Sequence, residues 1–92
     1  MANPWTKEDT NILEDIQTED GKSLVLHNDD HNTFNWVIES LVAICKHSYE
    51  QAEQCSLLVH FKGKCSVKEG ELNKLKPLKD GLIDRGLSAT IE

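Results

Sequence analysis

The sequence predicts a small α+β domain in which three helices cover one face of a three-stranded antiparallel sheet, in the chain order β-α-α-β-α-β. Three short segments have the length and residue pattern of strands, with glycine or polar turn residues beside them. Three longer segments repeat apolar residues at three- and four-residue spacing, as amphipathic helices do. The chain has 92 residues, which is the size of one domain with one modest core.

The first half of the chain predicts a strand, a polar turn and a helix. Residues 23–27 are short and aliphatic enough for a strand, and the five polar residues 28–32 favour a turn. Asn32 or Thr33 can cap the helix predicted over residues 34–47, because a short side-chain oxygen accepts an unpaired backbone N–H. The apolar stripe of this helix consists of Phe34, Val37, Ile38, Leu41, Ile44 and Cys45.

A second helix and a second strand follow. The helix is expected from an N-cap at Ser48 through His60, and Gly63 is its stop signal. The strand is expected over residues 64–67 and is closed by Gly70.

The last part of the chain predicts a helix over residues 71–84 and a final strand over residues 87–92. Pro77 is awkward inside this helix, because proline removes a hydrogen bond and clashes with the preceding turn. The helix therefore starts late, near Lys76, or it kinks at the proline. Gly86 ends the helix, and the final segment alternates as a half-buried strand does.

The charge is acidic and lies at the front of the chain. There are 10 basic and 16 acidic residues. Residues 1–30 hold eight acidic and two basic side chains, whereas residues 31–92 hold eight of each. The first 20 residues have few large apolar side chains, so we expect a mobile acidic extension over residues 1–21 and a core domain over residues 22–92. The extension is either a solvated tail or an arm that another protein grips.

The composition also argues against several classes of partner. A net charge of −6 gives no basic face for nucleic acid or for an anionic membrane. No apolar run approaches the roughly 20 residues that span a bilayer. The N-terminus lacks the pattern of a secretory signal, so we expect a cytoplasmic protein.

No constellation of residues predicts an enzyme, a metal site or a cofactor. The serines lie in no nucleophile elbow, and Cys45, Cys55 and Cys65 form neither a disulfide framework nor a Cys-x-x-Cys pair. We therefore expect these cysteines to be small buried residues or half-exposed thiols. Metal-ligand spacing is also absent from the histidines, which are His27, His31, His47 and His60.

Four polar residues have two interpretations each when only the residues are considered. His60 follows an apolar helical run, so it is either a satisfied, partly buried histidine or a hydrogen-bonding group at the mouth of a pocket. Asn28 ends an apolar strand and is either a turn residue or a ligand group. Asp29 and Asp30 are either turn-forming, helix-end acids or part of a site.

Read together, these segments resemble the ClpS family of protease adaptors. The resemblance covers about residues 23–92. It is carried by Leu24-Val25-Leu26-His27-Asn28-Asp29-Asp30, by Phe34 and Trp36-Val37-Ile38, by Ala52-Glu53-Gln54, by Leu58-Val59-His60-Phe61-Lys62-Gly63-Lys64 and by the closing Leu87-Ser88-Ala89-Thr90-Ile91-Glu92. Asn-Asp-Asp followed by Val-His-x-x-Gly-Lys in this order and at this separation is fairly specific.

The resemblance implies an adaptor that recognises proteins by a Leu, Phe, Tyr or Trp at the N-terminus and hands them to an AAA+ unfoldase of a Clp protease. Asn28 and His60 match the residues that hydrogen-bond the α-amino group, and His60 must be neutral to accept. Asp29 matches a residue that contacts the same amine, and Asp30 matches a supporting acid. The matching pocket walls are Asn32, Phe34, Val37, Ser56, Val59 and Leu87.

The sequence also departs from the family pattern. Methionine is common in the family where this chain has Phe34 and Ser56, and Asn32-Thr33 stands in place of Thr-Pro. The implied partner is the N-terminal domain of a ClpA- or ClpC-type unfoldase. Its contact positions transfer weakly, to Glu71 and Lys76, because residues 65–86 form a shorter segment than usual.

A different class of function remains open from the sequence. The same small α/β pattern suits a general protein–protein interaction module of the ribosomal-stalk type, which binds no N-terminal residue. The two functions differ in one structural feature, since only the adaptor needs a pocket beside Asn28, Asp29 and Asp30.

Overall fold

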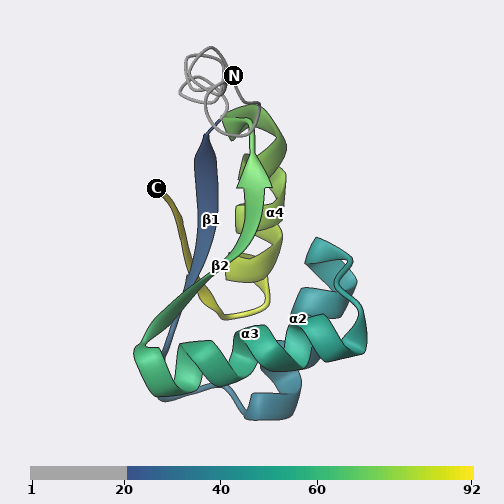
Figure 1. The fold of residues 1–92 in the computed structure, drawn as a ribbon, viewed down its shortest axis with the longest axis vertical. Helices are drawn as coiled ribbons and strands as arrows, with labels where there is room; N and C mark the ends of the chain where they lie inside the picture. The colour runs from purple at the N-terminus through teal and green to yellow at the C-terminus, as the bar shows by residue number, and fades with distance from the viewer. Residues whose placement is uncertain (1–20) are drawn as a thin grey trace, which may run out of the picture.

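A computed structural model describes residues 21–92 and shows an α+β fold with the expected chain order (Figure 1). The strands are β1 (Lys22–His27), β2 (Lys64–Gly70) and β3 (Ser88–Ile91). The helices are α2 (Phe34–Cys45), α3 (Tyr49–Lys62) and α4 (Leu72–Asp84). The predicted fold class is confirmed. The predicted acidic extension over residues 1–21 lies outside the described residues except for Gly21.

The sheet is antiparallel and has the strand order β2-β1-β3, so β1 is the central strand. Leu24 pairs with Lys68, but Val25 pairs with Ser66, which leaves Val67 as an extra residue in β2. The carbonyl of Val67 accepts a hydrogen bond of 2.7 Å from Nε2 of the buried His47. This bond fixes the segment between α2 and α3 against the sheet.

Side chains and glycine set the helix ends. Thr33, one of the two predicted caps, accepts from the backbone N–H of Trp36, and Ser48 accepts from that of Gln51. The first helix was expected to reach residue 47 but ends at Cys45. Lys46 has a left-handed backbone with φ 61°, which turns the chain and lets the ring of His47 reach β2.

The last helix has nearly the predicted bounds, and of the two alternatives that Pro77 left open, the late start near Lys76 is wrong. The helix α4 begins at Leu72 and continues through Pro77. The proline removes the N–H partner of the Asn73 carbonyl, but both residues are exposed, so water can satisfy that carbonyl. The second strand is also longer than expected and ends at Gly70 instead of residue 67.

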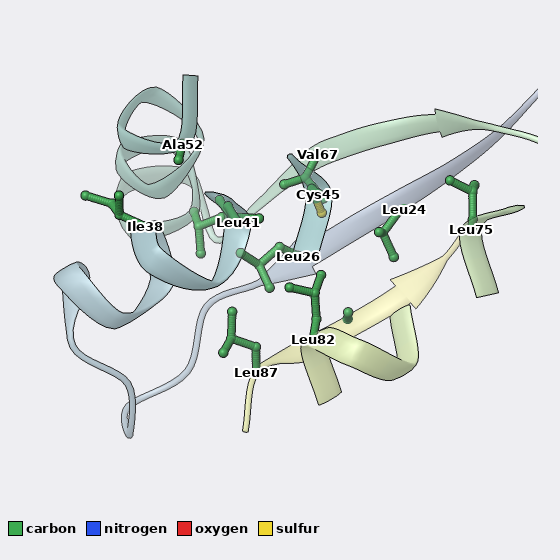
Figure 2. Packing of buried hydrophobic residues seen from close by; sticks show 12 residues of the cluster. Leu24, Leu26, Ile38, Leu41, Cys45, Ala52, Val67, Leu75, Leu82 and Leu87 are labelled. Atoms are coloured by element: carbon green, nitrogen blue, oxygen red, sulfur yellow. The ribbon is translucent and has the colours of Figure 1, made fainter. Parts of the chain in front are cut away.

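The core lies where the inner side of the sheet meets the three helices (Figure 2). Its fully buried leucines come from different elements: Leu24 and Leu26 from β1, Leu41 from α2, and Leu75 and Leu82 from α4. Contacts between elements far apart in the chain therefore hold the fold together. Among the described residues, no helix is both long and apolar enough to span a membrane.

Candidate functional site

A cavity of about 510 Å³ lies between the loop after β1, the start of α2 and the second half of α3. Polar and acidic residues of the loop form one part of its lining, and mostly apolar residues of the two helices form the other. The lining residues are Asn28, Asp29, Asp30, Asn32, Phe34, Val37, Ser56, Leu57, Val59, His60 and Phe61. Its volume is in the usual range for a small-ligand pocket.

The sheet brings Asn28 and His60 to the same cavity although they are far apart in the sequence. His27 at the end of β1 pairs with Lys64, and the backbone N–H of Asn28 donates to the Gly63 carbonyl at 2.9 Å. Gly63 caps α3 with φ 94°, a conformation that favours glycine. The loop is thus held against the last turns of α3, which carry His60.

Both of these side chains are open to solvent at the cavity. Asn28 and His60 are exposed, which contradicts the interpretation of His60 as a partly buried histidine. The His60 ring meets the ring of Phe61 edge to face, with centroids 4.9 Å apart. The arrangement leaves an imidazole and an amide beside a largely apolar cavity.

Asp29 is the residue around which the loop is organised. Its Oδ1 accepts from the backbone N–H groups of His31 and Asn32 at 2.8 and 2.9 Å. Nδ2 of Asn32 donates to Oδ1 at 3.1 Å and to Oδ2 at 2.9 Å. Oδ2 has this single partner in the described part of the chain and can accept from a ligand as well.

The same contacts keep Asp29 ionised. Partial burial opposes the negative charge of Asp29. This effect is outweighed by the hydrogen bonds from the Asn32 side chain and from the backbone of Asn32 and His31, and by the charge of His31. The pKa of Asp29 is therefore lowered from its usual 3.8. Because the pKa of Asp29 is lower in the folded than in the unfolded chain, its ionisation stabilises the fold at pH values above the unfolded-state pKa. This contribution is lost as the pH falls through the folded-state pKa.

We expect Asn32→Ala to raise the pKa of Asp29, because the substitution removes the largest of the hydrogen-bond contributions that lower it. An NMR titration of the Asp29 carboxyl carbon measures this directly. The variant should also lose stability at neutral pH, and its difference from the wild type should shrink as both are acidified below about pH 4. Asn35→Ala, at an exposed position of α2, is the control. An unchanged titration of Asp29 would contradict this account of the loop.

The other side of the loop is tied to the turn between α4 and β3. Nδ2 of Asn32 also donates to the Gly86 carbonyl at 2.8 Å, and Nε1 of Trp36 donates to the Arg85 carbonyl at 2.9 Å. The Arg85 guanidinium lies 4.3 Å from the centre of the Trp36 ring, and its Nε donates to Ser40 at 2.9 Å. No local sequence pattern links residues so far apart, so this supporting role of Trp36 and Arg85 was not predicted.

The structure places five of the six predicted wall residues on the cavity. The sixth, Leu87, is buried and lines a small adjoining cavity of about 20 Å³ with Val37 and Val59. The side chain of Ser56 is buried, and its hydroxyl has no partner in the described chain. Leu57 and Phe61 also line the cavity and were not among the predicted wall residues. Their i, i+4 spacing, with His60 between them, is the signal that could have identified them.

Glu71 and Lys76 lie apart from the cavity. Glu71 occupies the N-cap position of α4 without a capping side-chain hydrogen bond, directly after Gly70, which pairs with Lys22 at the first residue of β1. The cavity lies beyond the last residue of β1. Figure 1 shows the start of α4 and the helix α3 at opposite ends of the molecule. Within residues 21–92, no three His, Cys, Asp or Glu side chains form a cluster that could hold a metal ion.

Comparisons of sequence point to one protein family. The family model described as "ATP-dependent Clp protease adaptor protein ClpS" matches residues 17–90. The chain is 35% identical over 75 residues to the ATP-dependent Clp protease adapter protein ClpS of Oleidesulfovibrio alaskensis, covering 77% of this chain and 72% of that protein. It is 39% identical over 56 residues to the protein of the same name from Edwardsiella ictaluri, covering 59% of this chain and 53% of that one.

The fold is similar to that of a solved structure, Agrobacterium tumefaciens ClpS2 bound to L-phenylalaninamide. The superposition has a TM-score of 0.69 and covers 80% of this chain and 96% of the other. The sequence identity is 24%, so this likeness concerns the arrangement of the backbone.

Proposed function

The chain belongs to the ClpS family of adaptor proteins of the ATP-dependent Clp protease, and we propose that its cavity binds the N-terminus of proteins that begin with a bulky hydrophobic residue. A member of this family is an adaptor and not itself a protease. The substrates we propose carry Leu, Phe, Tyr or Trp at the N-terminus, and the chain delivers them to an AAA+ unfoldase.

The lining of the cavity carries the proposal. An N-terminal residue of this kind has a positively charged ammonium group next to a large apolar side chain. The cavity joins acceptors for the ammonium group (the Asn28 amide oxygen, the Asp29 carboxylate and a neutral His60 nitrogen) to an apolar surface from α2 and α3. Asp30, also on the lining, adds negative charge at the same place.

The solved structure of similar fold supports the same ligand class. Its ligand, L-phenylalaninamide, is a phenylalanine with a free amino group. A general interaction module offers no reason for a cavity of this size beside Asn28 and Asp29, so we favour the adaptor function.

Delivery requires a second surface for the unfoldase. We propose that the exposed Glu71 and Lys76 contribute to it and that the N-terminal domain of a ClpA- or ClpC-type unfoldase binds there. These residues and the cavity belong to opposite ends of β1, so substrate and unfoldase can bind at the same time. The acidic residues 1–21 are the segment that we propose the unfoldase engages during delivery.

Asn28→Ala and His60→Ala are expected to weaken binding of a fluorescent peptide that begins with phenylalanine. Each substitution leaves one ammonium proton without its partner, at a cost of roughly 1–3 kcal/mol, or about 5- to 150-fold in Kd. Fluorescence polarisation measures the affinity.

The matched control is Asn35→Ala, whose side chain is exposed next to Phe34 and does not line the cavity. Circular dichroism checks that all three variants fold. Wild-type affinity in the Asn28 and His60 variants, or no binding of the peptide by the wild type, would remove the proposal.

A further inference from the structure

The buried part of the cavity lining contains a hydroxyl group that no hydrogen bond satisfies. Ser56 of α3 lines the cavity and is 2% exposed. Its Oγ has no hydrogen-bond partner among residues 21–92, although most buried polar groups of folded proteins have one. The other buried residue of the lining, Val59, is apolar. Ser56 thus places an unused donor and acceptor beside an apolar surface.

The position of Ser56 on α3 relates this hydroxyl to the place where we propose that the ammonium group binds. Ser56 lies four residues before His60, so the two share one face of the helix and are about 6 Å apart along its axis. A tyrosine side chain has about this length from its Cα to its hydroxyl oxygen. A first residue whose ammonium group lies at His60 can therefore direct its side chain along α3 and bring the far end to Ser56.

We propose that Ser56 selects tyrosine as the first residue of the substrate, by a hydrogen bond between Oγ and the phenol hydroxyl. This role rests on the proposed function of the cavity. Each of the two hydroxyls can donate and accept, and rotation about the Cα–Cβ bond of the serine turns Oγ towards the cavity that the residue lines. Leucine and phenylalanine end in carbon and leave the serine hydroxyl unpaired.

The expected preference follows from the pairing of both hydroxyls. The phenol hydroxyl loses its water when it enters an apolar cavity, and the bond to Ser56 replaces that water. The bond also satisfies Oγ, which is too deeply buried in the empty protein to be hydrated. A peptide that begins with tyrosine should therefore bind roughly 2- to 10-fold more tightly than the same peptide beginning with phenylalanine.

Competition between two peptides that differ only in a first residue of tyrosine or phenylalanine tests the proposal. The readout is the ratio of their dissociation constants, so a change that weakens both peptides equally cancels. In Ser56→Ala the phenol hydroxyl has no partner, and the preference for tyrosine should be lost or reversed. Ser66→Ala is the matched control and should keep the wild-type ratio, because Ser66 is exposed and does not line the cavity.

Thermal unfolding tests the unpaired state of Oγ without any peptide. Removal of an unpaired buried hydroxyl breaks no hydrogen bond, so the thermal midpoint of Ser56→Ala should equal or exceed that of the wild type. A fall of more than about 4 °C would show that Oγ has a partner in the folded chain, and the proposal would be wrong.

The binding results separate this role of Ser56 from the proposed function. Equal affinities of the wild type for the two peptides, or the wild-type ratio in Ser56→Ala, would overturn the role of Ser56. The proposed function would stand, because both peptides still bind. If neither peptide binds to the wild type, the proposed function fails and the role of Ser56 fails with it.

Discussion

A peptide that begins with phenylalanine should bind this chain at micromolar strength or tighter, roughly −8 kcal/mol, and acetylation of its N-terminus should abolish that binding. Acetylation removes the positive charge and leaves one N–H donor where the ammonium group has three. The acceptors Asn28, Asp29 and His60 line a single cavity, so the loss removes several charge-assisted hydrogen bonds together. We expect affinity to fall by at least roughly 100-fold.

The control is a peptide with the same free amine but alanine in the first position. It keeps the ammonium contacts and loses the apolar ones, so it should also bind weakly. Competition against a labelled phenylalanine peptide gives all three affinities in one assay. Equal binding of the acetylated and free peptides would show that the cavity recognises side chains only, and the role given to Asn28 and His60 would be wrong.

Leu82→Ala is expected to lower the free energy of unfolding by about 2–5 kcal/mol, measured by urea denaturation. Leu82 of α4 is fully buried, and Figure 2 shows it near the centre of the cluster with Leu26 and Leu87. The truncation leaves a cavity between α4 and the sheet in addition to the lost burial. Domains of this size are stable by about 5–15 kcal/mol in total, so the loss is a large fraction of the stability of the fold.

The neighbouring residue gives a matched control. Ile83 lies on the same turn of α4 but is 46% exposed, so Ile83→Ala should cost less than about 1 kcal/mol. Similar losses for the two variants would mean that α4 does not pack through Leu82. The comparison separates the burial of a side chain from the helix propensity of alanine, since both variants introduce the same residue.

Local signals were sufficient for most of the fold. Ser48 and Gly63 set the ends of α3 because capping depends on residues within one turn of the helix end. The same reasoning was wrong at residues 46–47, where the end of α2 depends on a contact between His47 and Val67. At Pro77 it left two alternatives, of which the late start is wrong, because α4 continues through this exposed proline and water can satisfy the freed carbonyl.

The site was less accessible to local reasoning. No spacing in the chain links Asn28 to His60, and only the resemblance to known adaptors predicted that they act together. The structure places both on one cavity. Phe61 was not among the predicted wall residues, and only the structure shows the cavity beside this exposed side chain.

The chain by itself therefore determined the six elements, their order and most of their ends, since periodicity, caps and turns act over a few residues. Tertiary structure alone decided what meets across the fold: Asn28 with Gly63 at the end of α3, Asn32 with Gly86, and Trp36 with Arg85. The physical reason is that these contacts depend on the register of β1 with its neighbours, and that register is set by the packing of the whole core.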